Sequence, residues 1–237
     1  MRFVPLIVCL ILVTSAISQG LQLSDFVGGR GRNWDAIKVL EHGDGELRAG
    51  NYQAARRDFD AAIGADPTLW VAMYWRARLS AIEHKWEEVV RDCNEVLRQE
   101  STFVEAAVLR GVAYEALGRH SAALHELSSA IALRPVRTET FVWALERRAW
   151  LQATCPDSSI RNSRLATDDA KKACSMTKWR EAEPIDTLAT ASAAAGDFDS
   201  AVRYEQQAMQ AYDAGEMKKT LEEHAVMFKQ RRPVRLK

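Results

Sequence analysis

The side chains that most often carry acid–base, nucleophilic or metal chemistry are scattered in this sequence. Five histidines lie along the chain, at His42, His84, His120, His125 and His224. No serine lies in the strand-to-helix turn that exposes a hydrolase nucleophile, and Cys155 has no activating base near it in the sequence. We therefore predict that the protein is not an enzyme and that it has no catalytic, cofactor-binding or metal-binding residue.

The charge balance argues against a nucleic-acid partner. The sequence has 32 basic and 32 acidic residues, whereas nucleic-acid-binding domains concentrate positive charge to neutralise phosphates. The glycine cluster Gly28-Gly29-Arg30-Gly31 lacks the Lys-Ser/Thr ending of a phosphate-binding loop. We interpret this cluster as part of a linker.

The first 18 residues have the pattern of a signal peptide. Arg2 precedes an apolar stretch over residues 3–16, and Ala16-Ile17-Ser18 places small residues where a signal peptidase needs them. Cleavage after Ser18 would release a mature chain that is periplasmic or secreted, with no membrane span. The alternative is an uncleaved membrane anchor, although the stretch is shorter than the about twenty apolar residues of a span. Residues 19–35 are predicted to be a linker.

Three cysteines lie beyond the predicted signal peptide. Cys93 takes the place that Phe59 and Leu127 hold one repeat away on either side, so we expect a small buried apolar side chain. Cys155 and Cys174 flank a loop and could form a disulfide, but the sequence alone does not establish the geometry that a disulfide needs. The pairing is left open.

The rest of the chain shows a helical period. Apolar residues recur every three or four positions, and no segment alternates with the period of two that is typical of a strand. We predict a first helix that includes Ile37, Leu40 and Leu47. Further helices are expected over residues 52–63, 70–82, 86–97, 103–117 and 121–133.

These helices repeat at a spacing of 34 residues. Gly50-Asn51-Tyr52 corresponds to His84-Lys85-Trp86 and to Gly118-Arg119-His120. The small residues Ala55 and Ala62 recur as Val89 and Val96 and then as Ala123 and Ala130, and Pro67 recurs as Ser101 and Pro135. After Pro135 the register shifts by nine residues, which we assign to insertions within residues 136–140 and 155–162. The period then resumes with Ala166 and Ala201.

This pattern resembles the tetratricopeptide repeat (TPR), a helix-turn-helix unit of that length. The resemblance implies an all-α fold, a right-handed superhelix of about five helical hairpins. Repeats are expected near residues 36–69, 70–103, 104–137, 138–181 and 182–215, followed by a capping helix and tail over 216–237. The residues that carry the repeat signature are Gly50, Tyr52, Ala55, Phe59, Ala62, Pro67, Trp86, Gly111, Tyr114, Gly118, Ala123, Ala130, Pro135, Gly196, Phe198, Ala201 and Ala208.

The C-terminal half carries a second resemblance. Residues 149–157 read AWLQATCPD and residues 195–198 read AGDF, and together with the segments at 171–174, 186–189 and 228–233 they are similar to a cassette found in exported bacterial TPR proteins. This resemblance implies a bacterial exported protein and no catalytic activity. The last helix should cap the repeats, because Met217, Leu221, Ala225 and Phe228 fall on one stripe and charged residues surround it.

The resemblance also implies where a partner would bind. In TPR proteins the first helix of each pair lines a concave groove that holds a peptide or protein segment. The residues of this chain at such positions include Arg48, Tyr74, Arg78, Glu105, Glu115, Glu146, Trp150 and Asp186. The lysines and asparagines that clamp a terminal carboxylate in some members are absent, so we do not predict recognition of chaperone tails.

Three hypotheses follow for function. The first is a non-catalytic scaffold that binds a protein segment in the concave groove. The second is an accessory subunit of an envelope complex that uses the convex or cap surface. The third is an enzyme that acts on envelope polymers, although no catalytic motif in the sequence supports it. The aromatic residues of the groove have a competing structural interpretation, in which Tyr74 and Trp150 pack between neighbouring helices.

Overall fold

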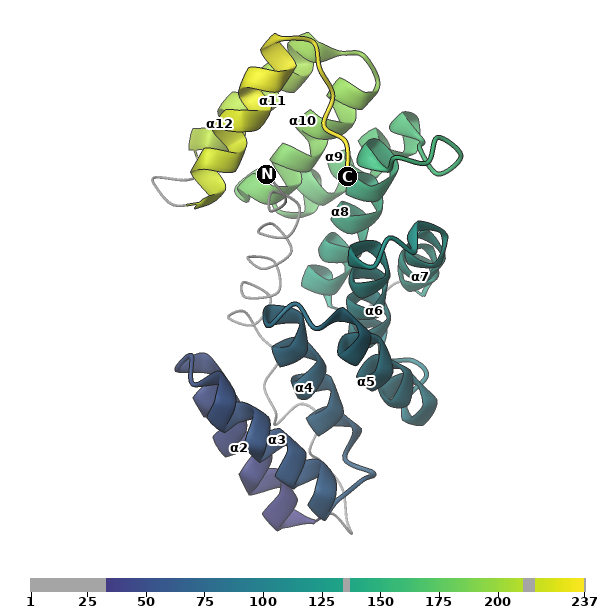
Figure 1. Ribbon diagram of the computed structural model, residues 1–237. Helices are drawn as coiled ribbons and strands as arrows, with labels where there is room; N and C mark the ends of the chain where they lie inside the picture. The colour runs from purple at the N-terminus through teal and green to yellow at the C-terminus, as the bar shows by residue number, and fades with distance from the viewer. Residues whose placement is uncertain (1–32, 134–136, 211–215, 237) are drawn as a thin grey trace. The chain divides into compact units, whose positions relative to one another are not determined.

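The computed structural model describes residues 33–133, 137–210 and 216–236, and within these ranges the chain is all α-helical (Figure 1). The residues described include no β-strand. The predicted signal peptide, most of the linker and the signature residue Pro135 lie outside the described residues. Contacts divide the chain into two compact units, which meet in sequence between Leu117 and Gly118.

Among its described residues, the first unit contains five helices. They are α2 (Trp34–Arg48), α3 (Tyr52–Ala65), α4 (Trp70–Ile82), α5 (Trp86–Gln99) and α6 (Val104–Ala116). Each helix packs against the next one along the chain, from α2 against α3 to α5 against α6. The helix predicted over residues 70–82 is confirmed with those bounds, and the others agree with the helical period to within a few residues.

The second unit contains six helices among its described residues. They are α7 (His120–Ala132), α8 (Thr138–Thr154), α9 (Ser163–Met176), α10 (Ala182–Ala194), α11 (Phe198–Gln210) and α12 (Glu216–Lys229). Here too each helix packs against its neighbour in sequence, and α10 also contacts α8. Such nearest-neighbour packing is typical of repeat proteins.

The turn between paired helices has the same backbone form in repeats with and without glycine. Gly50 has a φ of 80° in the left-handed region, which glycine adopts without Cβ strain. His84 holds the equivalent place with a φ of 58°. The second repeat therefore keeps the turn geometry although it lacks the turn residue.

Small residues allow the helices of the first unit to approach closely. Ala55 and Ala62 of α3 are fully buried, and Phe59 between them is also fully buried. A Cβ on Gly43 of α2 would come within 2.8 Å of the Phe59 ring. Tyr52, by contrast, is 40% exposed, so this turn aromatic fills the space between helices only in part.

The fourth helix pair, α8 and α9, contains the nine extra residues that shift the repeat register. These residues follow the start of α8 and do not precede it. Thr138 begins α8 at the 34-residue spacing from Val104, the first residue of α6. The helix α8 then has 17 residues against 13 in α4, and the connection at 155–162 is longer than the connection at 83–85. The predicted insertion within residues 136–140 is therefore wrong, because α8 has grown at its C-terminal end instead.

The last helix and the tail pack onto the second unit. Met217, Leu221, Ala225 and Phe228 are all buried, as predicted for the apolar stripe of α12. The tail continues over the same unit, where the Leu236 amide donates a hydrogen bond to the Thr154 carbonyl at 2.9 Å.

None of the three described cysteines is part of a disulfide. Cys93, Cys155 and Cys174 are buried, and no disulfide joins Cys155 to Cys174. Burial raises the pKa of the Cys174 thiol to about 12, with Glu146 adding to the effect. None of the described helices is long and apolar enough to span a membrane.

Candidate functional site

Two arginines on α4 face different surroundings although they are two residues apart. Residues at this separation point to different sides of a helix. Arg76 points toward α3 and α5 and binds acidic side chains of both helices. Arg78 points away from these acids and lies over the Trp75 ring. Arg76 is therefore an example of a charged group that is paired within the fold, and Arg78 is an example of one that lacks such pairing among the described residues.

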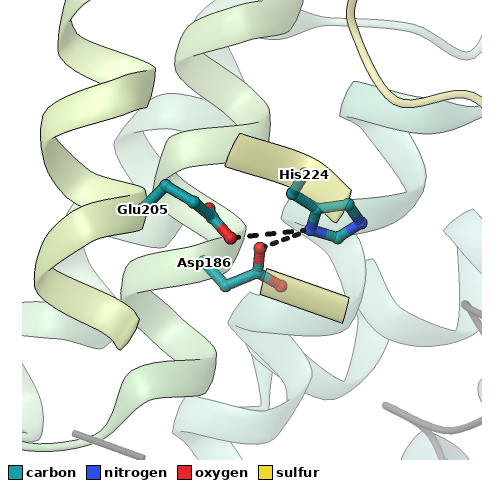
Figure 2. Close-up of side chains that lie close together, drawn as sticks. All are labelled: Asp186, Glu205 and His224. Carbon is teal, nitrogen blue, oxygen red and sulfur yellow. Dashed lines mark hydrogen bonds and ion pairs between the residues drawn. The ribbon is translucent and has the colours of Figure 1, made fainter. Parts of the chain in front are cut away.

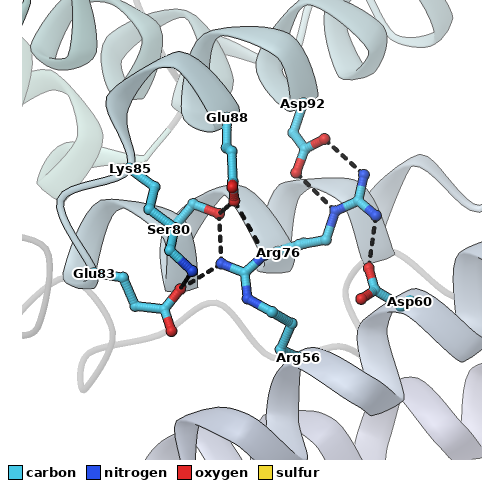
Figure 3. A network of polar contacts seen from close by, with 8 residues as sticks. All are labelled: Arg56, Asp60, Arg76, Ser80, Glu83, Lys85, Glu88 and Asp92. Carbon is cyan, nitrogen blue, oxygen red and sulfur yellow. Dashed lines mark hydrogen bonds and ion pairs between the residues drawn. The ribbon is translucent and has the colours of Figure 1, made fainter.

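Arg76 belongs to a network that is satisfied within the protein (Figure 3). Its guanidinium donates to both carboxylate oxygens of Asp92 at 2.9 and 2.7 Å and to Asp60 at 2.7 Å. The hydrogen bonds that Arg76 donates to Asp92 are the largest cause of the raised pKa of its guanidinium. Bidentate pairs of this kind are the stronger ion pairs of proteins, and here they tie α4 to α3 and α5.

Arg56 of α3 extends the same network (Figure 3). It donates to Glu88 at 3.1 Å, to Ser80 at 3.0 Å and to Glu83 by a short contact. Lys85 binds the same Glu83 carboxylate at 3.1 Å. Because these charges already have internal partners, this face offers little unpaired charge to a ligand.

Arg78 has no such partners. It is 3% exposed, and neither Nη1 nor Nη2 has a hydrogen-bond partner in the part of the chain that the structure describes. Its guanidinium carbon lies 4.0 Å from the centre of the Trp75 ring and 5.8 Å from that of Tyr74, both within cation–π range. Burial lowers the pKa of Arg78, an effect that Tyr74 and Asp44 oppose.

A second incompletely paired charge lies on α2. One oxygen of Asp44 accepts a hydrogen bond from Arg48 Nε at 3.0 Å and forms an ion pair with Arg48 Nη2 at 2.9 Å. The other oxygen is buried without a hydrogen-bond partner among the described residues. The side chain of Arg48 itself is 47% exposed. On α6, the acids Glu105 and Glu115 are both buried. Most of the side chains predicted to line the groove in the first unit are therefore buried, and Arg48 is the exposed exception.

In the second unit, Trp150 belongs to the core. It is 2% exposed and packs in a cluster with Ala189 and Ala193 of α10, Phe228 of α12 and Val234 of the tail. Trp150 therefore packs between helices, as in the structural interpretation of the groove aromatics, and its contacts are with α10, the cap helix α12 and the tail. Glu146, one turn earlier on α8, is 3% exposed, and its Oε1 atom has no hydrogen-bond partner within the described ranges.

Asp186, the last of the predicted groove residues, lies in a buried polar cluster that the sequence did not predict (Figure 2). His224 Nδ1 donates to Asp186 Oδ1 at 2.8 Å, and Glu205 Oε1 is 3.9 Å from the same nitrogen. Burial raises the pKa of Glu205 well above its ordinary value, and Asp186 raises it further. The three residues come from α10, α11 and α12, and no local motif links them.

Comparison with solved structures identifies the class of fold. The chain is similar to TTC0263, a TPR protein of Thermus thermophilus, with a TM-score of 0.59 and 18% identity, over 83% of this chain and 98% of that one. It is also similar to PilF of Pseudomonas aeruginosa, with a TM-score of 0.67 and 15% identity, over 84% of this chain and 90% of PilF. The fold is therefore that of a TPR solenoid.

A larger assembly provides a third similar structure. The Cut9–Hcn1 hetero-tetramer of the APC/C matches with a TM-score of 0.70 and 17% identity, over 82% of this chain and 36% of the matched chain. At such identities the likeness shows the fold alone. No protein-family model and no curated protein sequence matches the chain.

Proposed function

We propose that this protein is a non-catalytic scaffold that binds a segment of another protein through the first helices of its TPR pairs. Arg78 carries the proposal, because the described chain supplies no hydrogen-bond acceptor to its Nη1 or Nη2 atom. A buried guanidinium without a carboxylate is costly, whereas a partner's acidic side chain would complete the site. We infer that the bound segment places a carboxylate beside Trp75.

The similar structures support this proposal at the level of the fold. Solved TPR proteins include the Cut9–Hcn1 hetero-tetramer, in which such a fold is part of a protein assembly. The Arg56 and Arg76 network is less suited to the same role, because its charges are paired with one another. Because Arg78 is 3% exposed, binding also requires that the groups covering it move aside.

The test compares Arg78→Met with the parent protein. Methionine keeps an apolar stem over Trp75 and removes only the charge. We expect a partner captured from an envelope extract and identified by mass spectrometry to bind the variant more weakly by at least about 1 kcal/mol, as for a central interface arginine. The melting temperature should be unchanged or higher, because an unpaired buried charge is lost.

The matched control is Arg91→Glu on α5, an exposed arginine on the second helix of the same pair. This variant should bind the partner as the parent does. If the folded Arg78→Met variant retains full affinity, the first-helix site is excluded. The convex or cap surface of an accessory subunit would then be the place to examine.

We also propose that the protein is exported. The proposal is supported by the basic start, the apolar stretch over residues 3–16 and the small residues that end at Ser18. The intact mass of the protein recovered from cells should correspond to a chain that begins at Gln19. Recovery of the full chain in the membrane fraction would replace export by membrane anchoring.

A further inference from the structure

The cluster of Asp186, Glu205 and His224 joins three successive helices of the second unit (Figure 2). One ligand atom from each residue lies within 4.8 Å of the other two. The closest approach is the 2.8 Å hydrogen bond from His224 Nδ1 to Asp186 Oδ1. All three side chains point to one place in the interior, where α12 meets α10 and α11.

Within the cluster, Glu205 has a long ion-pair contact with His224 Nδ1, at 3.9 Å, and no hydrogen bond among the described residues. This residue is fully buried, and neither carboxylate oxygen has a hydrogen-bond partner in the chain as described. Figure 2 shows the carboxylate directed toward His224 and Asp186. Buried polar groups almost always have a hydrogen-bond partner, so a carboxylate without one at this depth can serve as a ligand to a cation.

We propose that this cluster binds one divalent transition-metal ion of the Zn²⁺ class. Imidazole nitrogen and carboxylate oxygen are both ligands that Zn²⁺ takes in proteins, at about 2.0–2.2 Å. In a tetrahedral site, two atoms bound to one such ion lie about 3.4 Å apart. The cluster spans no more than 4.8 Å, so small side-chain movements would bring the three atoms into range.

The charge and the donor set select the ion. Two carboxylates and a neutral imidazole balance a doubly charged cation, which avoids leaving a net charge in the interior. Calcium prefers six to eight oxygen ligands and magnesium retains several waters, and neither suits three buried side chains that include an imidazole. Three side chains leave the fourth position of a tetrahedral ion to a water molecule, and the ion would fasten the cap helix α12 to α10 and α11.

A second histidine with two acidic neighbours provides a matched comparison. His42 Nδ1 is 2.7 Å from Asp58, and the opposite ring nitrogen is 3.8 Å from Glu46. Because the two acids approach different ring nitrogens, one ion cannot bind all three as it could at His224. The side chain of His42 is also 68% exposed. Its removal tests for adventitious surface binding.

The experiment uses the full chain, treated with a chelator and then titrated with ZnCl₂ near neutral pH. We expect one ion per chain by calorimetry and a rise in melting temperature on binding. Substitution of Co²⁺ should give a visible spectrum of nitrogen and oxygen ligation. Thiolate charge-transfer bands would instead place the ion on the cysteines and overturn the proposal.

Variants assign the binding to the cluster. Loss of a residue that merely supports a ligand weakens metal binding about 10–100-fold, so Glu205→Gln should weaken it by about 100-fold or more. His42→Gln should bind Zn²⁺ as the parent does. Circular dichroism checks that each variant is folded, and Asp186→Asn provides a second ligand variant. Absence of Zn²⁺ binding by the parent, or parental affinity in a folded ligand variant, overturns the proposal.

Discussion

At the scale of single residues, the described part of this protein contains buried charged groups without an internal hydrogen-bond partner. Arg76 and Arg78 show the difference on one helix, since Arg76 binds Asp92 and Asp60 while neither Nη1 nor Nη2 of Arg78 has a hydrogen-bond partner among the described residues. Burial of polar groups without partners costs stability. Such positions therefore indicate where stability has been given up for another purpose, which for Arg78 is the proposed contact with a partner.

Glu146 allows this cost to be measured through pH. Burial raises its pKa well above the ordinary value, and Glu183, Glu181 and Asp186 add to the effect, while Arg147 opposes it. The folded state thus holds the proton more tightly than the unfolded chain does. The resulting penalty is absent below the unfolded pKa and grows as pH rises toward the folded pKa.

We therefore expect Glu146→Gln to stabilise the protein near neutral pH by roughly 1–3 kcal/mol, the cost of an unsatisfied buried polar group. The gain should shrink toward zero as pH falls to about 4, the ordinary range of a glutamate. Denaturant unfolding at several pH values gives the measurement. Glu222→Gln at an exposed position of α12 is the control and should change little. A gain that does not depend on pH would contradict the assignment.

At the scale of elements, helix packing depends on small residues at the crossing positions. Ala62 is fully buried on α3, whereas its neighbour Ala61 is exposed. Adjacent residues of a helix differ by about 100° in direction, so the two positions share propensity and differ in packing. Ala61 and Ala62 are better matched for comparing an exposed with a buried position than Ala122 and Ala123 of α7, because Ala122 is half-buried.

Ala62→Leu should overpack the contact with neighbouring helices and lower the free energy of unfolding by ~1–3 kcal/mol. Ala61→Leu should change it by less than about 0.5 kcal/mol, as surface substitutions usually do. Thermal or denaturant unfolding of both variants provides the comparison. Equal loss in the two variants would show that the helical register assigned to α3 is wrong.

At the scale of the whole molecule, the C-terminal tail extends the second unit beyond its last helix. Val234 is buried in the cluster around Trp150, and Arg235 donates to the Ala153 carbonyl at 3.0 Å. The Leu236 amide adds a backbone hydrogen bond to Thr154. In repeat proteins each element stabilises its nearest neighbours, so the effect of the tail should be local.

Deletion of residues 233–237 should accelerate amide hydrogen exchange in α8 and α10, because Trp150 loses part of its cover. Exchange in α2 and α3 of the first unit should stay as in the parent, which provides an internal control. Hydrogen exchange followed by mass spectrometry resolves the helices separately. Unchanged protection of α8, or equal acceleration in α2, would contradict the local role of the tail.

The helices themselves could be predicted from the sequence, because their causes are local. The apolar period predicted α4 with its observed bounds, and the stripe of α12 is buried as predicted. The 34-residue spacing also placed the turn at His84, where the residue type alone gave no sign of a left-handed backbone. Periodicity depends on residues a few positions apart, and those residues are read directly from the chain.

What only the tertiary structure decided depends on residues far apart in sequence. Asp186, Glu205 and His224 meet because three helices pack together, and nothing in the spacing of 19 positions between successive members marks them as partners. The different surroundings of Arg76 and Arg78 likewise depend on which neighbouring helices carry acids toward each one. Ion pairing, burial and pKa depend on which side chains lie close together in three dimensions. The helical period of a single segment carries no information about contacts with distant segments.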